Sequence, residues 1–306
     1  MDEFELIRRY FDLPATSPGV VEGIGDDGAV VTPTAGFQLV QVIDSLVEGV
    51  HFLSNTAAAD IGYRVVAVNL SDIAAMGARP RWMTLALTVS AKEPEWFEQF
   101  GAGLHAAGAE FDVVLVGGDT TSGGAVVATV AITGEVEPGK ALLRSGAKVG
   151  ETIFVSGTLG DAAAGLQLLS RQQQDDFLSA RFLRPTARIH LGQELLGRAS
   201  AVIDISDGLA GDLRKLLVSS SVGAQIDIDL LPLSDALRQR FNVDEQRNFA
   251  ITGGDDYELC FTADRDVVQG IDGITAIGIV TQGDGLVFRQ GGDIVEYDDS
   301  GYRHFQ

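Results

Sequence analysis

The chain has 306 residues, of which 45% are hydrophobic, and its 43 acidic and 22 basic residues give a formal net charge of −21. This composition is typical of a globular α/β protein with one large or two ordinary domains. The negative charge argues against nucleic acid or an anionic membrane as a partner, because both would repel it. The acidic start lacks signal-peptide features and no apolar run is long enough to span a bilayer, so we expect a cytoplasmic protein.

The first half of the sequence alternates between helical and strand patterns. Thr56 is a candidate N-cap and Gly77 a candidate C-terminal cap of one long helix. The expected elements are, in chain order, a helix over residues 2–11, strands over 29–32 and 37–43, a helix over 56–76, a strand over 82–89, a helix over 94–109, and strands over 113–116 and 126–136.

A second series of strands and helices follows the segment Glu137-Pro138-Gly139-Lys140, which is the best candidate for a domain boundary. We therefore expect two α/β domains, over residues 1–137 and 138–306. The elements expected in the second half are a strand over 152–155, helices beginning at 160 and 207, and strands over 202–205, 224–228, 257–261 and beyond 274.

Aspartate recurs after Gly or Ser at the ends of apolar runs. A single Gly-Asp is ordinary turn chemistry, but several carboxylates gathered together would repel one another without a cation. Mg²⁺ prefers a few carboxylates together with substrate phosphates, so the set suggests a phosphate site with several Mg²⁺ ions. Asp26 and Asp161 are better explained as turn or helix-capping residues. The recurrent positions include Asp27, Asp44, Asp72, Asp119, Asp204, Asp207 and Asp255.

Other motifs are informative by their absence. The sequence contains neither the GxxxxGK[ST] phosphate loop nor the glycine loop and HRD elements of protein kinases. A phosphoryl-transfer enzyme with this sequence would therefore be of another design. The single cysteine, Cys260, lies in an apolar stretch and is expected to be a buried thiol, so no disulfide can form within the chain.

Six motifs occur in an order that resembles the thiamine-monophosphate kinases, a family of the aminoimidazole-ribonucleotide synthetase-like superfamily. The resemblance covers nearly the whole chain, from Phe4 to the segment Tyr302-Arg303-His304-Phe305. The motifs are Gly23-Ile24-Gly25-Asp26-Asp27, Ala67-Val68-Asn69-Leu70-Ser71-Asp72-Ile73-Ala74-Ala75-Met76-Gly77-Ala78, Val116-Gly117-Gly118-Asp119-Thr120-Thr121, Arg144-Ser145-Gly146-Ala147-Lys148, Ile203-Asp204-Ile205-Ser206-Asp207-Gly208-Leu209 and Gly253-Gly254-Asp255-Asp256-Tyr257-Glu258-Leu259.

The resemblance implies transfer of the γ-phosphoryl group of ATP to thiamine monophosphate, which gives thiamine diphosphate. It implies a fold of two α/β domains with mixed sheets, a homodimer that pairs through the N-terminal sheets, and nucleotide bound in a cleft between the domains. It also implies several Mg²⁺ ions. Donor and acceptor are both anionic, and two unit charges 4 Å apart repel by roughly 4 kcal/mol at an effective dielectric constant near 20, which the cations would offset.

The same resemblance assigns site residues position by position. No general base is expected, because the acceptor oxygen of a phosphate is already ionised near neutral pH. The implied Mg²⁺ ligands are Asp27, Val42, Ile43, Asp44, Asp72, Asp119, Asp204 and Asp207, with Val42 and Ile43 acting through backbone carbonyls where relatives usually carry hydroxyl residues. The implied ATP contacts are Gly118, Asp119, Arg144 and Ser206, and the implied contacts to thiamine monophosphate are His51, Asp255 and Tyr302.

Some features depart from the family or stay open. At Asp255 relatives commonly carry Glu, and an aromatic that often lies near the adenine has no clear counterpart here. The role of Glu258 is open. Two other functions remain as alternatives: another ATP-dependent synthetase of the same superfamily, of the aminoimidazole-ribonucleotide synthetase type, and a non-enzymatic cation-binding module, whose ligands would usually lie in one compact loop.

Overall fold

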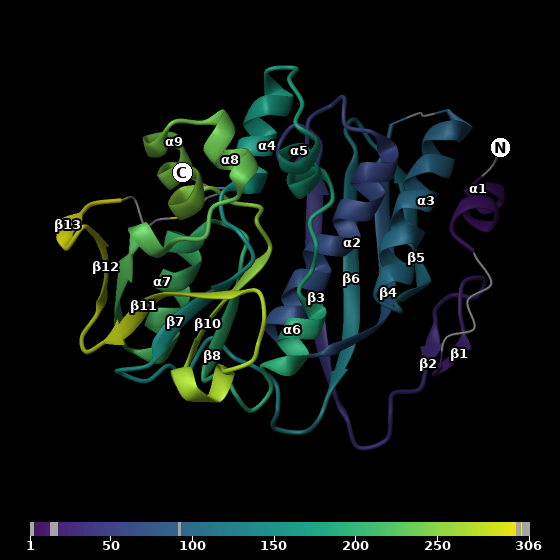
Figure 1. Cartoon of the computed structure of the whole chain (residues 1–306). Coiled ribbons are helices and arrows are strands. Elements are labelled where there is room, and N and C mark those ends of the chain that lie inside the picture. The colour runs from purple at the N-terminus through teal and green to yellow at the C-terminus, as the bar shows by residue number, and fades with distance from the viewer. Residues whose placement is uncertain (1–2, 13–17, 91–92, 298–300, 302–306) are drawn as a thin grey trace. The chain divides into compact units, whose positions relative to one another are not determined.

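The computed structural model describes residues 3–12, 18–90, 93–297 and 301, and these form two compact units (Figure 1). Unit 1 comprises Met1–Ile73 and Ala78–Gly139, and unit 2 comprises Ala74–Gly77 and Lys140–Gln306. Both units combine helices with mixed sheets, so the expected α/β class is confirmed. The division into domains over residues 1–137 and 138–306 that the sequence suggests stays a prediction.

Unit 1 is built on a four-stranded sheet with the order β3 (Gln38–Val47), β6 (Val127–Val136), β4 (Arg79–Val89) and β5 (Val114–Ser122). Strands β3, β6 and β4 pair antiparallel, whereas β4 and β5 run parallel. A small antiparallel sheet of β1 (Val20–Glu22) and β2 (Val30–Val31) precedes them. The helices are α1 (Glu3–Tyr10), α2 (Ala58–Ala75) and α3 (Pro94–Glu110).

Helix α2 ends where the sequence predicts. The N–H of Gly77 donates to the carbonyl of Ala74 and the N–H of Ala78 donates to that of Ile73, which is the Schellman arrangement. Gly77 has φ +65°, a left-handed conformation that favours glycine. The helix begins at Ala58, two positions later than expected, so Thr56 lies before it rather than at its N-cap.

The two faces of the unit 1 sheet differ. Helices α2 and α3 lie against one face (Figure 1). Alternate residues of the central strand β6, such as Val130 and Ile132, are buried. On β3, Leu39 is 47% exposed and Ile43 is 66% exposed. The other face of the sheet therefore carries apolar side chains that nothing in the described part of unit 1 covers.

Unit 2 contains a seven-stranded sheet with the order β13 (Asp293–Val295), β12 (Gly285–Gln290), β9 (Gly223–Asp227), β11 (Ile274–Thr281), β7 (Thr152–Ser156), β10 (Glu258–Ala263) and β8 (Ala201–Ile205). All neighbours pair antiparallel except β12 and β9. The helices are α4 (Asp161–Ser170), α5 (Asp176–Leu183), α6 (Ile189–Glu194), α7 (Leu209–Ser220), α8 (Asp235–Arg240) and α9 (Val243–Thr252), with short 3₁₀ turns at Ile228–Leu230 and Arg265–Val268.

The main core of unit 2 lies between α7 and the sheet. Leu209, Leu213 and Leu216 of α7 are fully buried in one cluster with Ile203 and other strand residues. Their three- and four-residue spacing is that of one helical face. Cys260 belongs to the same cluster and is fully buried, so the expected buried thiol is confirmed. Burial raises the pKa of this thiol.

Two strands differ from their expected lengths in a way that matters for the site. The strand expected over 113–116 is β5, which stays paired with β4 as far as Ser122, so Gly118 and Asp119 lie inside a strand rather than in a turn after it. The strand expected over 37–43 continues to Val47, because β3 stays paired with β6 as far as the Val47–Val127 pair. Asp44 therefore lies inside a strand rather than in a turn after it, which corrects the sequence-based interpretation. The polar pair Asp44-Ser45 is accommodated because β3 is an edge strand in the described sheet.

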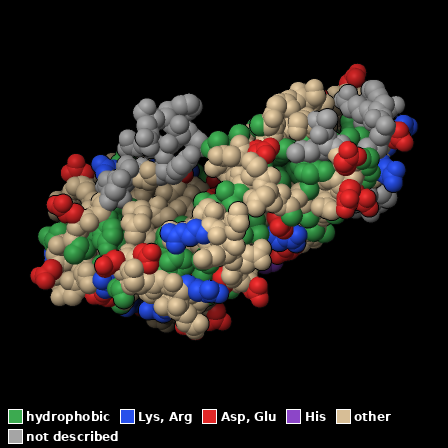
Figure 2. Space-filling view, turned by 90° about the horizontal axis from the view of Figure 1, so that it is seen from above, with side chains coloured by type: hydrophobic (Ala, Val, Ile, Leu, Met, Phe, Trp, Pro, Cys, Tyr) green, Lys and Arg blue, Asp and Glu red, His purple; other side chains and the backbone are tan. Residues whose placement is uncertain are grey.

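The acidic side chains do not gather on the one face of the molecule that a space-filling view presents (Figure 2). On the face seen in Figure 2, the Asp and Glu side chains are scattered rather than gathered into one patch. Among the described residues, no helix has the length and apolar character that a membrane span requires.

Candidate functional site

A cavity of about 850 Å³ in unit 1 brings together three of the predicted site residues, Asp27, Gly118 and Asp119. Its walls come from α1 and the residues after it, from the Gly-rich segment 23–29 and from β5. Asp26 also lines the cavity, and its carboxylate accepts the N–H of Asp27 at 2.8 Å. This bond supports the turn role expected for Asp26.

Gly118 is required by the close approach of two strands. It lies opposite Leu85 in the parallel β4–β5 pair, and a Cβ at this position would lie 1.9 Å from the Leu85 carbonyl oxygen. Only glycine lets β5 run there without moving β4. The next residue, Asp119, is exposed in the cavity, so the glycine fixes the backbone from which this carboxylate projects.

Asp44 does not join this group within unit 1. Asp44 of β3 lies opposite Val130 of β6. In the same row across the sheet, Val130 lies opposite Leu85 of β4, and Leu85 lies opposite Gly118 of β5. Asp44 and Gly118 are therefore separated by three strand-to-strand steps. At the usual spacing this is about 14 Å. Val42 and Ile43 are adjacent on the regular edge strand β3, and alternate residues point their carbonyls in opposite directions. Only one of the two can offer an unpaired carbonyl without leaving the ladder.

Asp72 lies near the C-terminal end of α2, as expected, and is half-buried. One turn earlier, Asn69 is fully buried, and its Nδ2 donates to the Val65 carbonyl at 2.8 Å. Its Oδ1 accepts no hydrogen bond from any described residue. A buried carbonyl oxygen without a donor is costly, so a donor or cation at this position would satisfy it.

His51 lies in a tight turn after β3. Its backbone N–H donates to the Val47 carbonyl, and its Nδ1 accepts the Val47 N–H at 3.0 Å. Because Nδ1 is an acceptor here, the neutral ring carries its proton on Nε2. The turn therefore fixes both the orientation and the tautomer of the imidazole, with Nε2–H as a hydrogen-bond donor.

Four predicted site residues gather at the carboxyl end of β8 in unit 2. Asp204 is the penultimate residue of β8 and is 5% exposed, and Ser206 and Asp207 follow the strand. The N–H of Asp255 donates to the Ser206 carbonyl at 2.8 Å, and the N–H of Tyr257 donates to the Ile205 carbonyl at 2.8 Å. These bonds hold the segment 253–257 against the end of β8.

Two residues that the sequence analysis did not single out hold Ser206 and Asp207 in place. The buried carboxylate of Asp212 accepts the N–H of Ser206 at 2.9 Å and that of Asp207 at 2.8 Å. Lys215 Nζ lies 2.6 Å from Asp207 Oδ2 and 2.8 Å from Asp212 Oδ1. Burial raises the pKa of Asp212, and Lys215 offsets part of this rise. The sequence signal for this arrangement was the spacing of the three charged residues, with Asp212 five positions after Asp207 and Lys215 three positions after Asp212 on α7.

The capping role expected for Asp161 is wrong. The N-cap of α4 is Gly160, and Asp161 is instead a fully buried acceptor for the hydroxyls of Thr158 and Ser234. Asp256, from a segment far along the chain, accepts the N–H of Gly160 at 2.7 Å. The cap is thus supplied by tertiary contact, which no local pattern shows.

Two predicted residues are not part of this group. The Leu143 carbonyl accepts the N–H of Val202, near the start of β8, so Arg144 and Ser206 lie at opposite ends of that strand. Tyr302 lies outside the described residues. Its neighbour Gly301 packs against Asp207, since a Cβ on Gly301 would lie 3.4 Å from the Asp207 Cβ.

The donor chemistry of these residues fits Mg²⁺. Among the described residues no three His, Cys, Asp or Glu side chains gather into a ready metal site. Mg²⁺ commonly uses only one or two carboxylates, and substrate phosphates and water supply the rest. The oxygen donors Asp27 and Asp119 in one cavity, and the Asn69 Oδ1 that lacks a donor, agree with that pattern.

The chain resembles known proteins over nearly its whole length. The model of the AIR synthase related protein N-terminal domain matches residues 25–136, and that of the C-terminal domain matches residues 148–291. The thiamine-monophosphate kinase of Escherichia coli (strain K12) is 45% identical over 99% of this chain and 98% of the relative.

Solved structures agree with these matches. The crystal structure of thiamine-monophosphate kinase from Stenotrophomonas maltophilia K279a has a TM-score of 0.84 at 43% identity, over 90% of this chain and 92% of that one. A structure described as "AaThiL complexed with AMPPCP and TMP" has a TM-score of 0.82 at 35% identity, over 92% of each chain.

Both domain matches mark the fold of the AIR synthase related proteins. Within that group, the chain belongs to the thiamine-monophosphate kinase family, which confirms the resemblance drawn from its six ordered motifs. The family consists of phosphotransferase enzymes, so the alternative of a non-enzymatic cation-binding module is not supported.

Proposed function

We propose that this chain phosphorylates thiamine monophosphate with ATP and so forms thiamine diphosphate. The observation that carries the proposal is the likeness, over 92% of both chains, to a structure that holds AMPPCP and TMP. AMPPCP is an ATP analogue, so that neighbour binds the donor and the acceptor of this reaction together. The cytoplasmic localisation expected from the sequence stays a prediction.

In this proposal the unit 1 cavity receives the nucleotide phosphates. Gly118 and Asp119 line it at β5, and Asp27 lines it from the Gly-rich segment. Ile7 also lines this cavity, and its apolar side chain is proposed to contact the adenine in place of the aromatic residue that relatives often carry. Ser206 and Arg144 are proposed as further nucleotide contacts, and His51, Asp255 and Tyr302 as acceptor contacts.

Mg²⁺ bound at Asp27, Asp44, Asp72, Asp119, Asp204 and Asp207, with a carbonyl of Val42 or Ile43, would neutralise charge on the transferring phosphoryl group. The side chains themselves orient the two anions and fix their separation. His51 is proposed to donate from Nε2–H to the acceptor. Since a phosphate oxygen is the nucleophile, no side chain needs to remove a proton.

We also propose that the protein is a homodimer that pairs through the uncovered face of the β3–β6–β4–β5 sheet. Leu39 and Ile43 are 47% and 66% exposed on this face. Such apolar side chains on a sheet are commonly covered by a partner. Sedimentation equilibrium of the wild type and of Ile43→Lys tests this. A monomeric wild type would contradict it, and dissociation of the variant would support it.

The function is tested by ADP release in a coupled assay with ATP and thiamine monophosphate. We expect ADP only when thiamine monophosphate and Mg²⁺ are both present. An aminoimidazole-ribonucleotide precursor in place of thiamine monophosphate distinguishes the other synthetases of the superfamily. Turnover with that precursor, or full turnover in excess chelator, would overturn the proposal.

A further inference from the structure

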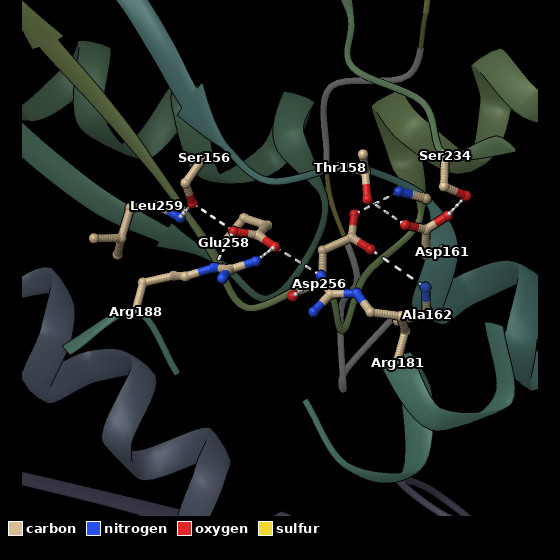
Figure 3. Close-up of polar contacts among 11 residues, drawn as sticks. Ser156, Thr158, Asp161, Ala162, Arg181, Arg188, Ser234, Asp256, Glu258 and Leu259 are labelled. Carbon is tan, nitrogen blue, oxygen red and sulfur yellow. Dashed lines mark hydrogen bonds and ion pairs between the residues drawn. The ribbon is translucent and has the colours of Figure 1, made fainter. Parts of the chain in front are cut away.

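Glu258 begins β10 and is fully buried, yet it makes four polar contacts with charged or hydroxyl side chains (Figure 3). Arg188 binds it with two groups, Nε at 2.6 Å and Nη2 at 2.5 Å. Arg181 Nη2 donates to it at 2.8 Å, and Ser156 Oγ donates to it at 2.5 Å. A buried carboxylate without partners would be costly. Here two guanidinium groups pair with the one carboxylate, and these charge-assisted hydrogen bonds make a tightly ordered cluster.

This cluster is connected to the segment that carries Asp255. Arg181 Nη2 donates to the backbone carbonyl of Asp256 at 3.0 Å as well as to Glu258. The Asp256 carboxylate accepts the N–H groups of Gly160 and Ala162. The segment is therefore held from its buried side at Asp256 and Glu258, and from β8 at Asp255 and Tyr257.

The held segment has an uncommon backbone. Asp255 has φ +71° and Tyr257 has φ +53°, and neither is glycine. Such residues are uncommon in the left-handed region, and the surrounding structure must over-determine them. The Tyr257 hydroxyl donates to Asp255 Oδ1 at 3.0 Å, so this backbone conformation also sets the direction of the Asp255 carboxylate.

We propose that Arg181, Arg188 and Glu258 are positioning residues, which hold segment 253–257 in the conformation that presents Asp255 to thiamine monophosphate. The inference rests on the proposed function, in which Asp255 contacts the acceptor. It assigns a role to Glu258, whose side chain is fully buried. The two arginines act through Glu258 and the Asp256 carbonyl, and they are not themselves catalytic residues.

The test uses Arg188, because its side chain is 31% exposed and tolerates replacement better than Glu258. In Arg188→Met we expect the KM for thiamine monophosphate to rise about tenfold, while the KM for ATP stays within about twofold. Arg188→Lys keeps one charged donor, and its KM should lie between those of the wild type and Arg188→Met. Arg198→Met is the matched control, because Arg198 forms an exposed ion pair with Glu194 that lies outside the Glu258 cluster, and it should change neither KM.

A double-mutant cycle separates positioning from a general loss of stability. In an Asp255→Ala background, Arg188→Met should have no further effect on the KM for thiamine monophosphate, because the contact that it positions is gone. Thermal unfolding of each variant sets an assay temperature at which all are folded. If Arg188→Met does not fold, the same cycle is run with Arg188→Lys.

The outcomes are distinguishable. If Asp255→Ala leaves the KM for thiamine monophosphate unchanged, the proposed acceptor contact itself is wrong. If Asp255→Ala raises it and neither Arg188 variant does, the positioning role is overturned. An equal rise in both KM values would overturn it as well, because it would mean that the cluster supports the end of β8 with Ser206 rather than the acceptor contact.

Discussion

The two units hold their candidate site residues by different physical means. In unit 1, Asp27 and Asp119 project into an open cavity from a Gly-rich segment and from a strand that Gly118 allows to pack closely. In unit 2, Ser206, Asp207 and Asp255 are held by buried carboxyl groups and their partners, namely Asp212, Asp256 and the Glu258 cluster. Backbone shape positions the first set and buried polar groups position the second. Variants of unit 1 should therefore affect activity with little effect on stability, and variants of unit 2 should affect both.

The largest effect that tests this contrast is expected from Asp119→Asn. The side chain is exposed in the cavity, so its loss should lower kcat by at least about 10²-fold, a typical cost of removing one electrostatic contact to a transition state. The unfolding temperature should change by less than about 2 °C. Asp26→Asn is the matched control in the same cavity, and it should leave kcat nearly unchanged. A normal kcat in Asp119→Asn would remove this residue from the site.

Gly157→Ala tests how much the Glu258 cluster of unit 2 contributes to the stability of the protein. Gly157 has φ +55°, and a Cβ there would lie 2.2 Å from Glu258 Oε1 and 2.7 Å from Arg188 Nη2. We expect the free energy of unfolding to fall by about 3 kcal/mol, from the left-handed backbone together with the displaced ion pair.

Gly139→Ala separates the two causes, because Gly139 has φ +72° but a Cβ added there would meet no atom within 4 Å. Here the loss should be only about 1 kcal/mol, from the backbone alone. Urea unfolding of both variants provides the measurement. Equal losses of unfolding free energy in Gly157→Ala and Gly139→Ala would show that the Glu258 cluster does not depend on the space beside Gly157.

The buried carboxyl groups of unit 2 predict a dependence of stability on pH. Burial raises the pKa of Asp256 to about 8, with Arg181 and the N–H groups of α4 offsetting part of the rise. The folded state thus binds this proton more tightly than the unfolded state, whose pKa is near 3.8. The contribution of Asp256 is full below pH 3.8 and is lost as the pH rises towards 8.

Asp256→Asn should remove this dependence. The free energy of unfolding of the wild type minus that of the variant should fall by up to about 1.4 kcal/mol per pH unit between pH 4 and 8. Denaturant titrations at several pH values measure the difference. A difference that is constant with pH, or that grows as the pH rises, would contradict the expected direction.

A smaller kinetic effect than that of Asp119→Asn is expected from His51→Ala in unit 1. The Nδ1 of His51 already accepts the Val47 N–H, so only Nε2–H can serve the acceptor. Loss of one such hydrogen bond should raise the KM for thiamine monophosphate by about tenfold and leave kcat and the KM for ATP nearly unchanged. Steady-state kinetics with each substrate varied in turn measures this. A rise confined to the KM for ATP would move His51 to the nucleotide site.

Much of the fold could be predicted from local sequence patterns, whereas the contacts that hold the site residues in place could not. The α2 helix and its Gly77 cap, and the presence of strands at Val116 and Asp204, follow from periodicity and turn residues that lie within a few positions of one another, although β5 continues past Gly118 to Ser122. The cap of α4 by Asp256 and the pairing of Arg188 with Glu258 join residues 96 and 70 positions apart. Such contacts depend on the tertiary fold, so a single sequence shows the charged residues but not their partners.

Because its one cysteine is buried, the protein contains an intrinsic probe of local unfolding. Cys260 lies in β10, two residues after Glu258, between Val155 of β7 and Ile203 of β8, with none of its surface exposed. A thiol reagent can reach it only when this strand separates from its neighbours. The rate of labelling in the unmodified protein therefore measures how often the centre of the unit 2 sheet opens, and a bound substrate that steadies the sheet would slow it.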